Sequence, residues 1–318
     1  MTTDRAPLPK GNAICYSGYR DGQSPGARRY PSVEQIREDL HLLARHWSLI
    51  RLYDCTPHAE RVLQVIRDDG LPLKVLLGAW LEAEMNNFGC PWGGTHEEAT
   101  LEANARLNDA ECERLVALAR QHEQAVFAVA VGNEATVDWT DHYVPVPRMI
   151  ELVRRVRGQV AQPVSFCENY VPWHHKLEPL VAELDFISVH TYPVWEYKHI
   201  HEALDYTRDN VLGVARRFPG KPVVITEAGW CTNSNGRGMR AEHAVQELQA
   251  EYLRDLDAWT KGEGILCFVF EAFDEAWKGS DDPLEPEKHW GLFTADRKPK
   301  LAVQPLYPEL EPAPGASA

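Results

Sequence analysis

The sequence has 318 residues, of which 44% are hydrophobic and 25% charged, a composition typical of a globular protein with one large domain or two smaller ones. Its 47 acidic residues outnumber its 33 basic residues, so the formal net charge is −14. This excess of negative charge disfavours nucleic acid and anionic membranes as partners and leaves neutral or cationic ligands.

Eight short apolar segments are spread along the whole chain. Each is rich in Val, Ile, Leu and Phe without strict alternation, which is typical of parallel strands buried on both faces. The predicted strands are 13–17, 49–54, 73–81, 126–134, 164–170, 186–192, 223–230 and 266–275.

Amphipathic helical stretches fill most of the intervals between these strands. Ser32 is expected to cap the first helix, and Gln35 follows three residues later in a capping-box arrangement. The interval after the fifth strand is short. The predicted helices are 33–47, 59–69, 102–122, 146–160, 201–218 and 241–261.

Eight strand–helix units in one chain of this length predict an α/β protein with a (β/α)8 TIM barrel. The alternative is an open doubly wound sheet, which would need a glycine-rich turn after an early strand. The first predicted strand is followed by 17–22, which lacks that pattern, and the G-x-G at 236–238 reads as a flexible loop. We therefore expect one catalytic barrel over 1–304 and a Pro-rich, disordered tail over 305–318.

Cysteine usage and the N-terminus give weaker indications. The seven cysteines include no C-x-x-C pair, which disfavours structural zinc and a disulfide framework. Residues 1–17 lack a secretory signal pattern, and no apolar run is long enough to span a bilayer. We expect a cytoplasmic protein as written, or a periplasmic or extracellular domain excised from a longer chain.

Four predicted strands end in a carboxylate directly after an apolar run: Glu134, Glu168, Glu227 and Glu271. The functional groups of a TIM barrel lie at these C-terminal strand ends. A carboxylate buried there is costly unless it is paired, so each is either a functional candidate or half of a structural ion pair with Arg51 or Lys278.

Two carboxylates on opposite sides of a barrel mouth are what glycosidic bond cleavage requires. One protonates the leaving oxygen and the other attacks the anomeric carbon. Glu134 and Glu227 follow the fourth and seventh predicted strands, and from there a retaining separation of about 5–5.5 Å is attainable.

The motifs around these glutamates resemble those of glycoside hydrolase family 17. The segments that carry the resemblance span nearly the whole chain and are 14–17, 131–134, 187–193, 225–230, 270–275 and 287–293. The resemblance implies a retaining β-1,3-glucanase of bacterial type, with Glu134 as acid/base and Glu227 as nucleophile. It implies no cofactor and no metal, and a β-glucan oligosaccharide or polysaccharide as the ligand.

The resemblance also implies roles for residues near the two glutamates. Asn133 would hold the sugar 2-hydroxyl at the cleavage point. Glu275, Lys278 and Glu287 match a charged cluster beside the nucleophile, where a cation would keep Glu227 ionised. The further candidates for substrate contacts are Tyr16, Tyr53, Glu168, His190, Tyr192 and Trp230.

Several features depart from the plant members of that family. Cys231 and Thr232 follow Trp230, and a histidine stands at position 190. This form is closer to bacterial and fungal members, some of which transfer glucan instead of hydrolysing it. A glucanosyltransferase and a non-catalytic glucan-binding barrel are therefore the alternatives, and we expect a monomer.

Tryptophans in the loops after strands are expected to stack on sugar faces. These are Trp92, Trp173, Trp195 and Trp277. The other histidines show no metal-ligand spacing and are interpreted as solvated or hydrogen-bonded side chains.

Overall fold

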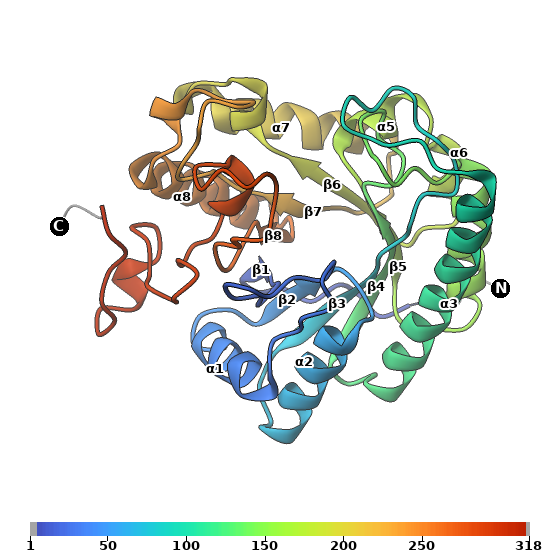
Figure 1. Ribbon diagram of the computed structural model, residues 1–318, viewed down its shortest axis with the longest axis horizontal. Helices are drawn as coiled ribbons and strands as arrows, with labels where there is room; N and C mark the ends of the chain where they lie inside the picture. Colours follow the sequence, from blue (N-terminus) through green and yellow to red (C-terminus); the bar gives the residue numbers. More distant parts are fainter. Residues whose placement is uncertain (1–4, 316–318) are drawn as a thin grey trace.

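The computed structural model describes residues 5–315, in which eight parallel strands form a ring enclosed by helices (Figure 1). The strand order is β5-β4-β3-β2-β1-β8-β7-β6. The predicted (β/α)8 barrel is therefore confirmed. The strands are β1 (Ala13–Cys15), β2 (Leu49–Leu52), β3 (Lys74–Ala79), β4 (Val126–Asn133), β5 (Val164–Cys167), β6 (Ile187–Thr191), β7 (Val223–Ala228) and β8 (Cys267–Val269).

The ring closes between β5 and β6 at the mouth of the barrel. An isolated parallel bridge joins Asn169 to His190, and the His190 amide donates to the Glu168 carbonyl at 2.9 Å. The closing contact therefore fixes the backbone of His190 directly beside the end of β5.

Helices cover the outside of the ring. Ser32 caps α1 and Gln35 completes the capping box, as the sequence predicted. Only two short helices follow β5. The helices are α1 (Val33–Leu43), α2 (Pro57–Asp68), α3 (Glu98–Gln121), α4 (Val146–Arg157), α5 (Tyr170–His175), α6 (Glu178–Val181), α7 (Ile200–Arg217) and α8 (Gln246–Glu263). Short 3-10 turns are η1 (Pro193–Glu196), η2 (Ala241–His243), η3 (Pro286–Lys288) and η4 (Gln304–Leu306).

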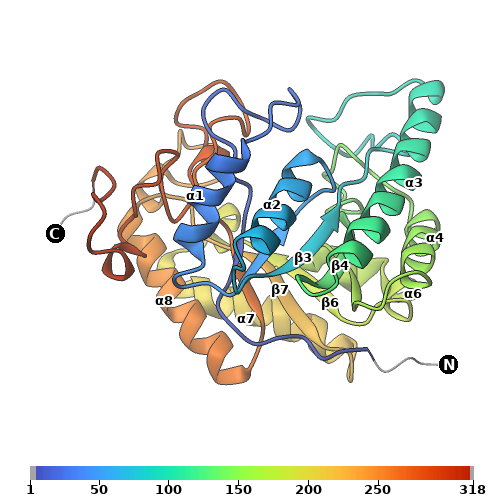
Figure 2. The same cartoon turned by 90° about the horizontal axis from the view of Figure 1, so that it is seen from below.

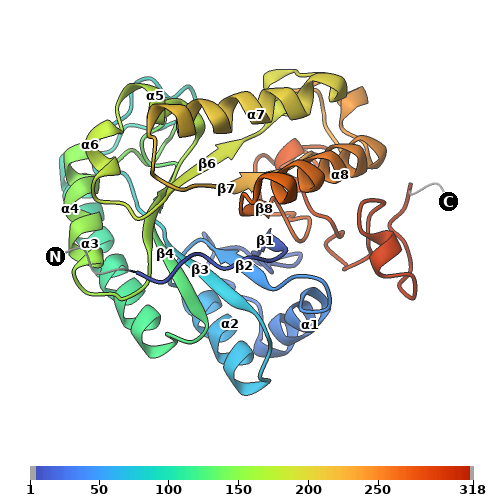
Figure 3. The same cartoon turned by 180° about the vertical axis from the view of Figure 1, so that it is seen from behind.

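The segment before β1 crosses the far end of the barrel, as the view from behind shows (Figure 3). Arg5 anchors its start by donating to the Arg157 carbonyl at 2.8 Å, at the end of α4. This segment lies opposite the mouth, where the loops after the strands gather.

The eighth strand is shorter than the predicted 266–275. After Val269 the chain leaves the ring and pairs with a later segment: the Glu271 carbonyl accepts from Leu292, and Phe293 donates to Ala272 at 2.9 Å. The residues directly after Val269 are also buried, so the apolar run extends beyond the end of the strand. Hydrophobicity alone therefore predicts a strand that is too long.

The C-terminal segment occupies the place of a helix after β8, between α1 and α8 (Figure 2). Tyr307 is fully buried, and its hydroxyl donates to the Leu42 carbonyl at 2.9 Å. Gln246 Nε2 donates to the Pro314 carbonyl. The expected disordered tail is thus packed over its described part, 305–315, because Tyr307 is buried beside α1 and Pro314 is held by Gln246 of α8. Residues 316–318 lie outside the described range.

Among residues 5–315, no helix combines the length and the apolar character needed to cross a membrane.

Candidate active site

A large cleft of about 1730 Å³ opens at the C-terminal ends of the strands. Loops after all eight strands contribute to its lining, with Ser17 after β1 and Phe270 after β8 at the two ends of the series. Glu134 and Glu227 both line it. The functional end predicted for a TIM barrel is therefore the end that holds the cleft.

Glu134 leaves the end of β4 in an unusual backbone conformation. Its φ is +46°, in the left-handed region that non-glycine residues rarely adopt, and Gly132 two residues earlier has φ +89°. The Glu134 amide donates to the Cys167 carbonyl at 2.8 Å, which holds this turn against β5. Such strain at a strand end is typical of functional positions, and here it directs a side chain that is 28% exposed into the cleft.

Glu227 lies within β7 and is only 5% exposed. Arg51 from β2 and the Tyr192 hydroxyl both donate hydrogen bonds to its carboxylate. Burial alone would raise the pKa of Glu227, but the positive charges of His190 and Arg51 and the hydrogen bonds from Tyr192 and Arg51 hold it below its usual value. Glu227 is therefore held ionised in a nearly dry site.

His190 lies between the two glutamates. Its Nδ1 is 2.9 Å from Glu134 Oε1 and 3.5 Å from Glu227 Oε2. Burial would lower the pKa of His190, but the Glu227 charge and hydrogen bonds to Cys167 and Glu134 raise it to about 10. The imidazole is thus positively charged at neutral pH and attracts both carboxylates.

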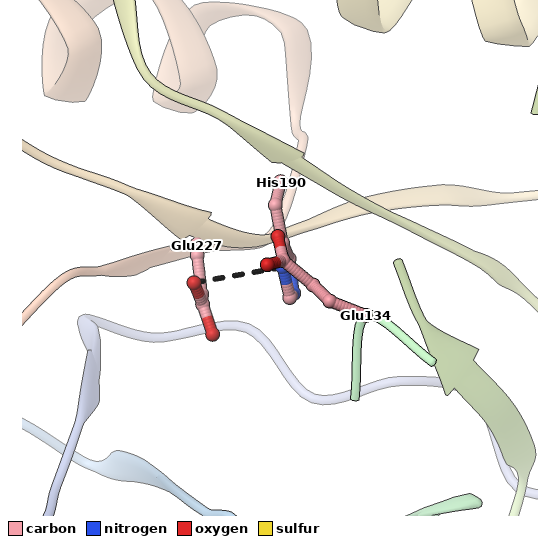
Figure 4. A group of neighbouring side chains, drawn as sticks. All are labelled: Glu134, His190 and Glu227. Carbon is pink, nitrogen blue, oxygen red and sulfur yellow. Dashed lines mark hydrogen bonds and ion pairs between the residues drawn. The ribbon is translucent and has the colours of Figure 1, made fainter. Parts of the chain in front are cut away.

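The three side chains converge from different strands (Figure 4). One ligand-type atom from each of Glu134, His190 and Glu227 lies within 4.8 Å of the other two. The two predicted catalytic carboxylates therefore do meet across the cleft. The sequence indicated His190 only as a substrate contact, whereas the structure places it between them.

Arg51, Asn133 and Tyr53 complete the floor beside Glu227. Arg51 donates one hydrogen bond to Glu227 and one to Asn133 Oδ1, and its guanidinium lies 4.4 Å from the centre of the Tyr53 ring. The arginine thus links the residue before Glu134 to Glu227. From the sequence, Arg51 was indicated only as a structural partner for a carboxylate. Its position as a charged residue in the middle of the apolar strand 49–54 is the feature that could have indicated a functional role.

The predicted charged cluster is present, but it acts differently from the expectation. Lys278 Nζ lies 2.6 Å from Glu271 and 2.7 Å from Glu275, so two buried carboxylates share its charge. Glu287 lines the cleft nearby, 3.9 Å from Arg237. The cations that keep Glu227 ionised are Arg51 and His190 and not Lys278, which corrects the prediction.

Three predicted substrate contacts are buried instead in the protein interior. Tyr16 is fully buried and donates to Asp39 at 3.1 Å, beneath α1. Trp230 is fully buried, and its Nε1 donates to the His243 carbonyl at 2.7 Å. These side chains stabilise the loops behind the cleft, so the prediction that they contact substrate is wrong.

Glu168 is the third of these residues. It accepts hydrogen bonds from the Thr136 amide at 2.9 Å, the Thr136 hydroxyl at 2.7 Å and the Asn169 amide at 2.7 Å. Burial and the nearby Glu134 raise its pKa to about 8. Glu168 therefore organises the turn after Glu134 and does not reach the cleft within the described structure.

Aromatic side chains line much of the cleft. Trp92, Trp195 and Trp277 do so as predicted, whereas Trp173 is fully buried in the core and donates to the Ser188 carbonyl at 2.9 Å. Trp290, which the sequence did not single out, also lines the cleft and packs against Tyr192 with ring centres 5.0 Å apart.

Two polar atoms of this lining, Tyr53 Oη and Trp290 Nε1, are buried without a hydrogen-bond partner among residues 5–315. An unpaired buried donor costs free energy that a ligand hydroxyl would recover. Both atoms are covered by surrounding protein, so a ligand could reach them only if neighbouring side chains moved.

Glu134, His190 and Glu227 also form the group of side chains whose spacing could suit a metal ion. The charges around them disfavour that use. The raised pKa of His190 keeps a proton on the imidazole, and Arg51 already neutralises Glu227. The prediction of a metal-free site stays a prediction.

Residues 13–291 match the family model described as the BtgE/BtgC glycoside hydrolase domain. The chain is 25% identical over 285 residues to a glucan 1,3-beta-glucosidase of Arthroderma benhamiae, with 84% of this chain and 83% of the relative covered.

Two solved structures share the fold. An endo-laminarinase from Formosa Hel1_33_131 superposes with a TM-score of 0.80 at 27% identity, covering 94% of this chain and 86% of its own. A glycoside hydrolase family 17 beta-1,3-glucanosyltransferase from Rhizomucor miehei gives a TM-score of 0.71 at 23% identity, covering 91% and 95%.

Proposed function

Because the chain belongs to the BtgE/BtgC glycoside hydrolase family, we propose that it hydrolyses β-1,3-linked glucan with retention of the anomeric configuration. The family membership also bears out the resemblance to glycoside hydrolase family 17. The substrate is inferred from the names of the relatives, a glucan 1,3-beta-glucosidase and an endo-laminarinase.

One observation supports the retaining mechanism above all. Carboxylate oxygens of Glu134 and Glu227 lie within 4.8 Å of each other. Inverting enzymes separate their carboxyl groups by about 6.5–9.5 Å to admit a water molecule, whereas retaining enzymes keep them about 5–5.5 Å apart. The short separation favours direct attack by one carboxylate on the sugar.

In this proposal Glu227 is the nucleophile. It is 5% exposed, so little water competes for its charge, and Arg51 and Tyr192 fix its orientation by hydrogen bonds. A carboxylate held ionised and positioned in this way can attack the anomeric carbon and form a covalent glycosyl-enzyme.

Glu134 is the acid/base. As the glycosidic bond breaks, its proton passes to the leaving oxygen. It then accepts a proton from the water that attacks the glycosyl-enzyme. The greater exposure of its side chain, 28%, suits a group that must meet both the leaving sugar and water. His190 Nδ1, 2.9 Å away, holds the carboxylate in place between these steps.

The stereochemistry of the first product tests the mechanism. Proton NMR at early times, with a laminari-oligosaccharide as substrate, should show the β anomer before mutarotation. Release of the α anomer first would establish inversion and reject the proposal.

Variants test the two residues. Glu227→Ala and Glu134→Gln should each lower kcat by roughly a thousandfold or more. Glu183→Gln is the matched control, because Glu183 pairs with Arg154 at 2.8 Å on the outer surface. Wild-type turnover in either active-site variant would exclude that glutamate from catalysis.

The same covalent intermediate could also be resolved by a sugar hydroxyl, which would make the protein a glucanosyltransferase. A specific feature of the cleft favours this second activity: Trp92 and Trp139 line it with 62% and 36% of their surface exposed, and Trp139 follows Glu134 by five positions.

A further inference from the structure

A histidine lies against the backbone of the turn that carries Glu134. His142 belongs to the loop between β4 and α4, and its Nε2 lies 2.9 Å from the Asn133 carbonyl oxygen. Asn133 directly precedes Glu134 in the chain. The contact is therefore made on the peptide group that leads into Glu134.

Both ring nitrogens of His142 face hydrogen-bond acceptors. Nδ1 lies 2.8 Å from Asp141 Oδ1, while Nε2 faces the Asn133 carbonyl, which can only accept. A carboxylate and a carbonyl are both satisfied when each ring nitrogen carries a proton. Burial would lower the pKa of His142, but its hydrogen bonds to Asp141 and to the Asn133 carbonyl raise it above its usual value. This favours the imidazolium, whose hydrogen bond to the Asn133 carbonyl is charge-assisted.

The ring of His142 is held in place by two loops. The Val144 amide donates to the Ala135 carbonyl at 2.8 Å and closes the loop that carries His142. Trp80, after β3, packs on the imidazole with ring centres 4.5 Å apart, and the His142 side chain is only 15% exposed. The position of Nε2 is therefore fixed independently of the turn that it contacts.

The turn itself needs support from its surroundings. Gly132 has φ +89° and Glu134 has φ +46°, a conformation that a non-glycine residue keeps only when neighbouring groups impose it. The Asn133 carbonyl and the Glu134 amide belong to one peptide group. Its N–H donates to the Cys167 carbonyl at 2.8 Å, and its C=O accepts from His142. This peptide plane is thus held at both ends.

The orientation of this peptide plane determines where the Glu134 carboxylate lies. A general acid must reach the leaving oxygen within hydrogen-bond distance, and a displacement of about 1 Å can cost on the order of a hundredfold in rate. Glu227 is held separately, by Arg51 and Tyr192. A disturbance at His142 should therefore affect proton donation and spare the nucleophile.

We propose that His142 is a positioning residue for the acid/base, and that its hydrogen bond to the Asn133 carbonyl fixes the peptide plane that directs Glu134 toward the leaving oxygen. This inference rests on the proposed retaining function with Glu134 as the acid/base. His142 takes no part in proton transfer, and Asp141 keeps the imidazole charged and oriented.

The test compares two substrates that differ in their need for a proton. Dinitrophenyl β-laminaribioside releases a stable phenolate without protonation, whereas methylphenyl β-laminaribioside needs a proton from Glu134. For both, kcat/KM reports the formation of the glycosyl-enzyme. His142→Leu should lower kcat/KM of the methylphenyl substrate about ten- to hundredfold and change that of the dinitrophenyl substrate by about threefold or less.

A rescue variant and a control accompany this comparison. His142→Gln keeps an N–H group near the position of Nε2 and should recover most of the loss. His41→Leu is the matched control, because His41 forms a similar pair with Asp69, 2.8 Å away, where the histidine side chain is 54% exposed on α1. Its substitution should leave both rates unchanged.

Two results would overturn the positioning role. Equal losses on both substrates in His142→Leu would indicate a general loosening of the barrel mouth, and losses of less than twofold on both would indicate that the hydrogen bond is dispensable. Should thermal unfolding show that His142→Leu is not folded, Asp141→Asn replaces it. This variant leaves the ring in place but weakens its charge-assisted hydrogen bond, and it should slow only the methylphenyl substrate, by about two- to fivefold. Unchanged rates in Asp141→Asn would reject the proposal.

Glu134→Gln separates a failure of this inference from a failure of the proposed function. It should show the same selective loss on the methylphenyl substrate in a larger form. If Glu134→Gln lost nothing, or lost equally on both substrates, the acid/base assignment itself would be contradicted. A selective loss in Glu134→Gln without one in His142→Leu would reject only the role of His142.

Discussion

The two glutamates differ in what surrounds them, although both are Glu at the end of a strand. Glu227 is nearly inaccessible and contacts Arg51, Tyr192 and His190, so its negative charge is neutralised on several sides. Glu134 faces the cleft from a turn with positive φ. In the proposed mechanism, this difference in surroundings is the reason for taking Glu227 as the nucleophile and Glu134 as the acid/base.

His190 should make the stability of the protein depend on pH. Burial lowers its pKa, but Glu227 and hydrogen bonds to Cys167 and Glu134 raise it to about 10, compared with about 6.5 for an unfolded histidine. A pKa raised by folding contributes stability that is complete below about pH 6.5 and is lost as the pH rises toward 10. In the wild type, the free energy of unfolding should therefore fall as the pH rises from about 6.5 toward 10. In His190→Asn this fall should be smaller, by on the order of 2–4 kcal/mol.

Urea unfolding at pH 6.5 and pH 9.5 measures this difference. His122→Asn is the control: burial lowers the pKa of His122, so this side chain is neutral in both the folded and the unfolded protein across most of that range. The same pH dependence in His190→Asn as in the wild type would show that the imidazole is not charged between the carboxylates.

At the scale of elements, the barrel is completed by a segment without a regular helix. The chain after β8 pairs with itself, passes between α1 and α8, and buries Tyr307 against Trp47, with ring centres 6.2 Å apart and planes at 14°. Tyr307 also packs against His46 and Phe293, so the ring of helices closes through a cluster of aromatic contacts and a few hydrogen bonds.

Tyr307→Ala should accordingly destabilise the fold. Removing a fully buried aromatic side chain costs about 3–5 kcal/mol, and the hydrogen bond to the Leu42 carbonyl is lost with it. Leu306→Ala, at a neighbouring position that is 42% exposed, should change the free energy of unfolding by about 0.5 kcal/mol or less. Chemical denaturation measures both. A cost below about 1 kcal/mol for Tyr307→Ala would mean that the segment contributes little to the stability of the barrel.

At the scale of the whole molecule, more of the fold than of the candidate site could be predicted from the sequence. All eight strands were recognisable because parallel strands covered on both faces are continuous apolar runs. A position at a strand end did not reveal where a side chain points. Tyr16 and Trp230 occupy such ends but are turned into the interior. Arg51 contacts a partner 176 residues away, and only the closed ring brings the two together.

The tail was misjudged for a related reason. Its proline content suggests disorder, but Tyr307 is ordered in a site beside α1, against Trp47 and Phe293, that exists only once the barrel has assembled. The sequence around Tyr307 does not indicate such a site, because the site forms only in the assembled barrel.

The size of the cleft sets the length of glucan that it should prefer. At about 1730 Å³ it exceeds the roughly 300–1000 Å³ of pockets that hold a drug-sized ligand, so it has room for several sugar units. Each added unit that still finds a contact should contribute binding that appears in the transition state. We therefore expect kcat/KM to rise from laminaribiose to laminaripentaose, by about tenfold or more in total, and then to level off.

A cello-oligosaccharide series of the same lengths controls for size without the β-1,3 linkage, and its kcat/KM should stay low throughout. Rates that are already maximal at laminaribiose would instead indicate that only the two sugars at the cleavage point are bound, and that the aromatic lining farther from Glu134 and Glu227 contributes nothing to catalysis.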